Sequence, residues 1–152
     1  MRCRKWIGFA LAALVLAAPS AASAEEVIKL GIPGAHTGDL AGYGIPALNA
    51  AKLVVEKYNA KGGINGKKIV IVQQDDQCKP ELATNAATKL VAEQVDIVMG
   101  HTCSGPTRAA LPVYEDKKIV NISPSATSTE LTRGGKFPRF FRTKSSDVAQ
   151  AR

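Results

Sequence analysis

Residues 65–82 read NGKKIVIVQQDDQCKPEL, which combines a turn, a strand and the start of a helix. Asn65-Gly66 is a common turn pair, and the unbroken apolar run from Ile69 to Val72 is typical of a strand covered on both faces of a sheet. Pro80 suits the first turn of a helix, and Glu81 beside it favours the positive end of the helix dipole. Strand and helix in immediate succession indicate an α/β fold with a parallel sheet.

The same alternation of apolar runs and helical patterns continues on both sides of this stretch. The runs predict five strands, at residues 27–32, 68–73, 95–99, 118–122 and 139–143. Three helices are expected between them: one from about Tyr43 to Gly62, one after Pro80, and one from Ser104, whose hydroxyl should cap the free amides. No crossover helix follows the last strand, so we expect an open parallel sheet that is incomplete.

Apolar side chains recur along the first two predicted helices at the spacing of one helical face. In the first helix one apolar face is formed by Ala47, Ala50, Ala51, Val54, Val55 and Tyr58. In the second we expect a buried stripe formed by Ala83, Ala86, Ala87, Leu90 and Val91.

The N-terminal segment has the layout of a secretory signal peptide. Three basic residues precede an apolar run from Trp6 to Ala18, and Ala22-Ser23-Ala24 forms a small-residue cleavage site. The apolar run has 13 residues, fewer than the roughly 20 that a membrane-spanning helix needs. We therefore predict a signal peptide at residues 1–24, cleavage after Ala24, and a mature domain of residues 25–152 outside the cytoplasm.

Charge and cysteine content narrow the class of protein further. The net charge of +7 includes three basic and no acidic residues from the leader, which leaves +4. The remaining basic residues are scattered, so no nucleic-acid partner is expected. Cys3 leaves with the leader, and Cys78 and Cys103 in an oxidising compartment predict a disulfide. A catalytic thiolate or half a metal site is the alternative, but the sequence has neither a CxxC motif nor a histidine cluster to support it, so no metal or cofactor is expected.

The candidate functional residues follow the carboxyl ends of the predicted strands, where open α/β sheets bind ligands. Three loops qualify: Pro33 to Tyr43, His101 to Ser104, and Ser123 to Ser128. Hydroxyls and free amides at a helix start can bind a carboxylate or a phosphate. No phosphate-binding glycine motif follows the first strand, which argues against a nucleotide.

An enzyme is the less favoured interpretation of the same loops. It would use His101, Cys103 and Ser104, with Asp75 or Asp76 as an orienting acid. Neighbouring residues in one turn rarely aim their side chains at each other, and no G-x-S-x-G motif is present. We therefore expect no catalytic residues.

Five segments in order resemble the Leu/Ile/Val-binding protein family of periplasmic amino-acid receptors. They are residues 34–38 (GAHTG), 59–66 (NAKGGING), 75–78 (DDQC), 100–104 (GHTCS) and 123–127 (SPSAT). The resemblance covers essentially all of residues 25–152. It implies an α/β fold of periplasmic binding protein type I, with two hinged lobes, each a flavodoxin-like parallel sheet with helices on both faces. This chain would hold the N-terminal ligand-binding lobe, incomplete.

The resemblance also implies residue roles. It pairs Cys78 with Cys103 and makes Ser104 a ligand for the α-carboxylate of an amino acid. Ser125, where related receptors often have alanine, offers its backbone carbonyl to the ammonium group. Thr127 contacts both charged groups, Ala126 lies between these two contacts, and Tyr43 is the aromatic residue expected over the ligand.

The function implied by the resemblance is substrate capture for an ABC importer of branched-chain or related amino acids. The expected partners are the amino acid and a membrane permease, and a monomer is expected. The alternatives are a receptor of the same superfamily for amides, urea or aromatic acids, and the ligand-sensing ectodomain of a receptor. The predicted signal peptide argues against a transcription regulator of similar fold.

Overall fold

The computed structural model describes residues 26–151, so the predicted signal peptide and its cleavage site lie outside the described residues. A five-stranded sheet has the order β2-β1-β3-β4-β5, and every pair of neighbouring strands is parallel. This is the flavodoxin-like order that the family resemblance implies. The strands are β1 (Val27–Gly34), β2 (Lys68–Asp75), β3 (Ile97–Met99), β4 (Val120–Ser123) and β5 (Phe140–Arg142).

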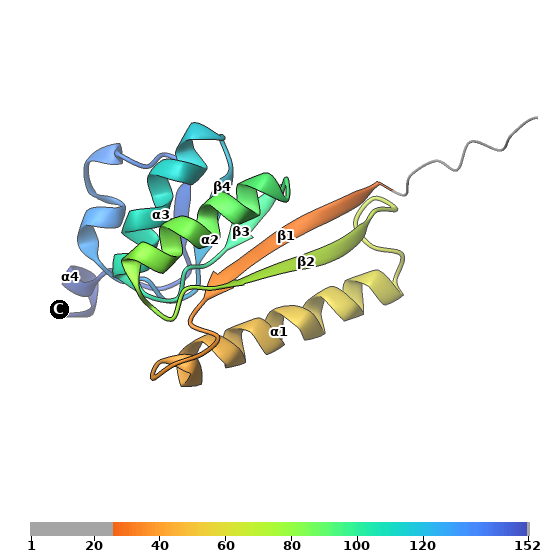
Figure 1. Ribbon diagram of the computed structural model, residues 1–152, viewed down its shortest axis with the longest axis horizontal. Coiled ribbons are helices and arrows are strands. Elements are labelled where there is room, and N and C mark those ends of the chain that lie inside the picture. The colour runs from red at the N-terminus through yellow and green to blue at the C-terminus, as the bar shows by residue number, and fades with distance from the viewer. Residues whose placement is uncertain (1–25, 152) are drawn as a thin grey trace, which may run out of the picture.

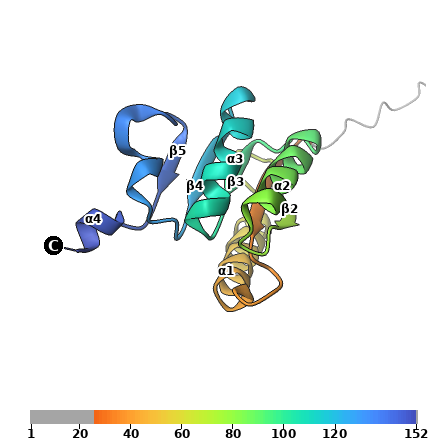
Figure 2. The same cartoon turned by 60° about the vertical axis from the view of Figure 1, so that its left-hand side comes forward.

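Helices cover both faces of the sheet, as predicted. The helix α1 (Ala41–Ala60) lies under β1 and β2, whereas α2 (Pro80–Ala92) and α3 (Ser104–Asp116) pack against each other on the opposite face (Figure 1). The chain also forms short helical turns that the sequence does not predict: η1 (Thr129–Leu131), η2 (Arg133–Gly135) and α4 (Asp147–Gln150). Figure 2 shows α4 beyond β5, at the opposite end of the sheet from α1.

The main core lies between the sheet and the α2–α3 pair. It consists of Ala83, Ala87, Leu90, Val95, Val98, Ala110 and Tyr114, all of them buried. The predicted stripe of α2 is confirmed at its alanines and at Leu90, which is 0% exposed. Small side chains let the helix approach the sheet closely, since a Cβ at Gly31 would lie only 3.3 Å from Leu90 and Val98.

Most of the apolar face of α1 is not buried. Of its six residues only Ala51 is buried, whereas Val54 is 52% and Tyr58 49% exposed. The reason is that α1 covers only the β1–β2 half of its face of the sheet. Beside it lie two apolar hollows of about 310 and 380 Å³, and strand side chains such as Leu30, Met99 and Ile122 line them.

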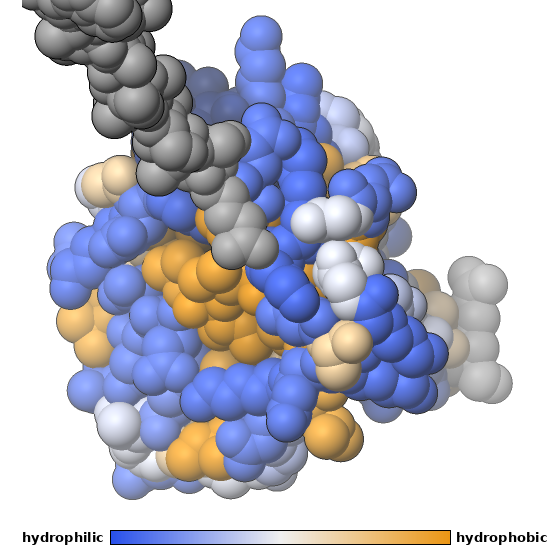
Figure 3. All heavy atoms as spheres, turned by 90° about the vertical axis from the view of Figure 1, so that its right-hand side faces the viewer, coloured by the Kyte–Doolittle hydropathy of each residue, from blue (hydrophilic) through white to orange (hydrophobic). Residues whose placement is uncertain are grey.

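Figure 3 looks onto the end of the sheet at which β1 begins. Apolar surface gathers in the middle of this side of the molecule, inside a ring of hydrophilic residues. A helical face is buried only where a partner surface meets it, and the periodicity of the sequence carries no information about the partner.

Cys78 and Cys103, which are 25 positions apart in the chain, form the predicted disulfide, with their Cα atoms 5.6 Å apart. Cys78 lies between β2 and α2, and Cys103 lies between β3 and α3. The bond therefore joins the starts of the two helices that pack together on one face of the sheet.

We predict that Leu90→Ala lowers the free energy of unfolding by about 2 to 5 kcal/mol, because it leaves a cavity in the main core. Leu53 on α1 is 69% exposed, and the matched Leu53→Ala change should cost less than about 0.5 kcal/mol. Urea unfolding monitored by circular dichroism measures both values. Equal losses for the two variants would contradict this description of the core.

We also predict that reduction of the disulfide lowers the free energy of unfolding by about 3 to 4 kcal/mol in the chain-entropy model. Urea unfolding with and without a phosphine reductant measures the difference. The double variant Cys78→Ser, Cys103→Ser is the control and should not respond to the reductant. Mass spectrometry of the oxidised chain should give a mass two hydrogens below that of the reduced chain, and free thiols at both positions would rule out the bond.

Candidate functional site

Three loops meet at the carboxyl edge of the sheet, as the sequence predicts. They follow β1, β3 and β4, and the chain crosses to opposite faces of the sheet from the neighbouring strands β1 and β3. Such a switch point is where open α/β sheets bind ligands. The loops are held to one another by carboxylates on one side and by serine hydroxyls on the other.

Asp75 at the end of β2 organises the loop after β1. One of its carboxylate oxygens accepts hydrogen bonds from the amides of His36, Thr37 and Gln77, at 2.9, 3.3 and 3.0 Å, and the other accepts one from the Thr37 hydroxyl. Burial opposes ionisation of Asp75, but the hydrogen bonds from Thr37, Gln77 and His36 outweigh it and lower the pKa of the carboxyl. The loop is therefore built around an ionised carboxylate.

Asp76 belongs to a fully buried network with His101 and Tyr114. One nitrogen of the His101 ring, Nδ1, bonds to the carboxylate of Asp76, and Nε2 lies 3.0 Å from the Tyr114 hydroxyl. The second carboxylate oxygen of Asp76 accepts the amide hydrogen of Cys78 at 2.7 Å. Burial, together with the charge of Asp76, raises the pKa of Tyr114 far above its usual range, so the hydroxyl stays protonated. The network braces the loops after β2 and β3 against α3.

The enzyme interpretation receives no support from this arrangement. Asp76 does orient His101, but the pair has no solvent exposure. Cys103 is held in the disulfide, and the Ser104 hydroxyl bonds to the loop after β4. The structure therefore does not bring the three candidate residues together around an accessible space.

Serine hydroxyls form hydrogen bonds between the loops after β3 and β4. Ser123 donates to the carbonyl of His101 at 2.7 Å and accepts the amide hydrogen of Ala126 at 3.0 Å. The Ser125 hydroxyl donates to the carbonyl of Thr102. The Ser104 Oγ accepts the amide hydrogens of Thr127 and Ser128, both at 3.1 Å.

The expectation that Ser104 caps its own helix is therefore wrong. Cys103 occupies the N-cap position of α3, without a side-chain cap. The Ser104 hydroxyl instead accepts hydrogen bonds from a loop 23 and 24 positions later in the chain, because two amides converge on it from outside the helix.

Some donors and acceptors of these serine and threonine residues remain free to bind a ligand. A hydroxyl has two lone pairs and one hydrogen, so Ser104, which already accepts two amide hydrogens, has its own hydrogen left to donate. Within residues 26–151 the Thr127 hydroxyl and the Ser125 carbonyl make no hydrogen bond, and both residues are at least partly exposed. Two donors and one carbonyl acceptor thus lie on one pair of loops.

The remaining predicted site residues lie differently. Ala126 is 1% exposed and packs with Leu111, Leu131 and Phe140, so it anchors the loop from below. Tyr43 lies in the first turn of α1 and is 72% exposed. The other four predicted residues lie at the start of α3 and in the loop after β4, and among the described residues Tyr43 makes no hydrogen bond to them.

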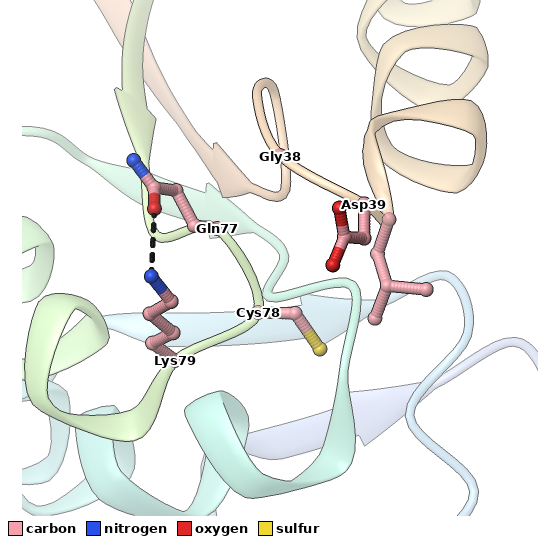
Figure 4. A pocket seen from close by; sticks show the side chains of 6 residues that line it. Gly38, Asp39, Gln77, Cys78 and Lys79 are labelled. Carbon is pink, nitrogen blue, oxygen red and sulfur yellow. Dashed lines mark hydrogen bonds between the residues drawn. The ribbon is translucent and has the colours of Figure 1, made fainter.

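A hollow that the sequence does not predict opens next to the disulfide (Figure 4). It has a volume of about 270 Å³ and is lined by Gly38, Asp39, Leu40, Gln77, Cys78 and Lys79. The Lys79 ammonium group donates to the side-chain oxygen of Gln77 at 3.1 Å. The hollow lies at the same edge of the sheet, between the loops after β1 and β2.

Residues 26–151 contain no group of three histidine, cysteine or acidic side chains placed to hold a metal ion. None of their helices has the length and apolar character needed to cross a membrane.

Comparison with known proteins gives close relatives over nearly the whole chain. It is 40% identical over 140 residues to the leucine-specific-binding protein of Salmonella typhimurium, and 41% identical over 137 residues to the Leu/Ile/Val-binding protein of Escherichia coli K12. These alignments cover 92% and 90% of this chain but only 38% and 37% of the relatives. The chain therefore spans less than two fifths of their length.

Solved structures agree with the fold. A branched-chain amino acid transporter substrate-binding protein from Streptococcus pneumoniae, in complex with isoleucine, superposes with a TM-score of 0.76 at 36% identity, over 80% of this chain and 35% of that one. A solute-binding protein of an ABC transporter from Rhodopseudomonas palustris, in complex with 3,4-dihydroxybenzoic acid, gives 0.71 at 27% identity, over 79% and 32%.

The family model described as periplasmic binding protein matches residues 27–152, which include every strand and helix of the structure. This match agrees with the parallel sheet of order β2-β1-β3-β4-β5 and with the resemblance that the sequence suggests. The chain belongs to the periplasmic binding protein family.

Proposed function

We propose that this chain forms a ligand-binding lobe of the substrate-binding component of an ABC importer for branched-chain or related amino acids. The observation that carries the proposal is the set of free hydrogen-bonding groups on Ser104, Ser125 and Thr127. Relatives about 40% identical are named for leucine, or for leucine, isoleucine and valine. An amino acid carries the two charged groups that such a set can recognise.

The proposed contacts follow from the chemistry of the free groups. The hydroxyls of Ser104 and Thr127 donate to the α-carboxylate, and the carbonyl of Ser125 accepts from the α-ammonium group. The buried methyl of Ala126 holds the segment in place, and the exposed ring of Tyr43 offers an apolar surface to the ligand side chain. Capture needs no catalytic group, so we propose a binding protein and not an enzyme.

The proposed location is the periplasm, with the membrane permease of the importer as partner. The disulfide suits an oxidising compartment, and the family takes its name from periplasmic proteins. We further propose that residues 1–24 direct export, that cleavage follows Ala24, and that the exported protein is a monomer.

The site on this lobe is open to water on one side, which limits its affinity. Ser125 is exposed, and Ser104 and Thr127 are partly exposed. Periplasmic binding proteins close on the ligand by hinge motion, which excludes water from such contacts. Without a second closing surface each hydrogen bond contributes only about 0.5 to 1.5 kcal/mol net, so we expect the chain alone to bind weakly.

An aromatic acid is the second candidate ligand, because the Rhodopseudomonas palustris protein is in complex with 3,4-dihydroxybenzoic acid. The hydroxyls of Ser104 and Thr127 would serve any carboxylate. The Ser125 carbonyl distinguishes the two classes, because an aromatic acid has no ammonium group to donate to it.

We predict that the chain binds L-leucine, L-isoleucine or L-valine with a dissociation constant in the millimolar range. Binding of 4-methylpentanoate, which lacks the ammonium group, should be weaker than that of leucine. NMR titration of ¹⁵N-labelled protein measures both, and 3,4-dihydroxybenzoate tests the second candidate. If the aromatic acid binds more strongly than leucine, the ligand is an aromatic acid and not an amino acid. Micromolar binding of leucine would contradict a site that is open to water.

We predict that Ser104→Ala weakens leucine binding about tenfold, because it removes a hydroxyl that bonds to a charged group. The matched control is Ser145→Ala, at an exposed position whose hydroxyl makes no hydrogen bond within residues 26–151. The same NMR titration compares the two variants. Equal affinities for the parent chain and Ser104→Ala would show that the carboxylate binds elsewhere.

A further inference from the structure

Arg142 at the end of β5 donates hydrogen bonds directly to the loop after β4, which carries part of the proposed site. It pairs in register with Ser123 of β4, so β5 brings it to the carboxyl edge of the sheet. Its Nη1 donates to the carbonyls of Ser128 at 2.9 Å and Ala126 at 3.4 Å, and its Nη2 donates to the Thr132 hydroxyl. Among residues 26–151, no carboxylate lies within ion-pair distance of this guanidinium group.

Three successive carbonyls of the loop after β4 accept hydrogen bonds from β5 and from the start of α4. Arg142 holds those of Ala126 and Ser128, and the amide of Asp147 donates to the carbonyl of Thr127 at 3.0 Å. In a planar trans peptide the carbonyl and the next amide hydrogen point in opposite directions. Holding the Ala126 and Thr127 carbonyls on one side therefore turns the amides of Thr127 and Ser128 to the other side.

Ser104 lies on that other side. The amides of Thr127 and Ser128 are the two donors that occupy the lone pairs of its Oγ, both at 3.1 Å. With both lone pairs occupied, the hydroxyl hydrogen of Ser104 is left for a ligand. Aligned hydrogen bonds also polarise one another, so the bond from the Arg142 guanidinium to the Ala126 carbonyl strengthens the Thr127 amide of the same peptide as a donor.

We propose that Arg142 is a positioning residue for the amino-acid site, which holds the loop of residues 126–128 so that the Ser104 hydroxyl donates to the ligand carboxylate. This inference rests on the proposed function. Arg142 itself does not touch the ligand. An arginine suits the task because its planar fork presents donors in fixed directions to several oxygens at once, whereas lysine is a compact point charge.

The first test needs no ligand and measures hydrogen exchange of the Thr127 and Ser128 amides by NMR. In Arg142→Ala we expect both amides to exchange about tenfold faster, because the loop that protects them is released. Arg142→Lys should lie between this variant and the parent chain. The matched control is Arg133→Ala, at an exposed arginine of η2, and it should leave the exchange unchanged. Unchanged exchange in a folded Arg142→Ala variant would overturn the proposal.

The second test is a double-mutant cycle on leucine affinity, in the full chain recovered after export. Arg142→Ala and Ser104→Ala should each weaken binding about tenfold, and the double variant should bind only as weakly as either single variant. Effects that multiply would mean that Arg142 acts independently of Ser104, which would overturn the proposal. A parent chain that binds no amino acid would refute the proposed function and the part of Arg142 in it, whereas the exchange experiment would still decide whether Arg142 holds the loop.

Discussion

The complete burial of His101 is the constraint on which the carboxyl edge depends. An enclosed polar group must find a partner inside the protein or destabilise the fold. The two ring nitrogens of His101 meet Asp76 and Tyr114, and its carbonyl accepts hydrogen bonds from Ser123 and Thr107. These partners come from the loop after β2, from α3 and from β4. The hydrogen bonds that His101 needs therefore fix the relative placement of most of the elements that carry the proposed site.

The proposed site is built from neutral groups supported by charged ones. Asp75 and Arg142 each bind several backbone or hydroxyl groups of a loop, one as acceptor and one as donor. The hydroxyls and the carbonyl that remain free carry no formal charge. A zwitterion can therefore bind through oriented dipoles, and the site avoids the desolvation of a buried protein ion.

Much of the fold is predictable from the sequence, because apolar runs and helix signals are local. The unbroken run at Ile69 to Val72 identifies β2, and the alternation of strands with helices indicates a parallel sheet. The strand order itself is given only by the family resemblance. Burial along α1 is not predictable, since it depends on which surface covers the helix. The hydrogen bonds that the Ser104 hydroxyl accepts are not predictable from a local capping rule, because the two amides that donate them come from a distant loop. The Asp76–His101 pair joins positions 25 apart, which no short motif reveals. The four residues of α4 are too few to show a helical period.

The hydrogen bonds of the serine hydroxyls in the loops after β3 and β4 have a consequence for the kinetics of the proposed ligand binding. Ser123, Ser125 and Ser104 already hold these loops in place without a ligand. Meeting a ligand then requires little ordering of this surface, so the conformational entropy lost on first contact is small. Association with such a surface is limited mainly by diffusion and orientation. Discrimination among ligands of similar size must then come from how long each one stays bound.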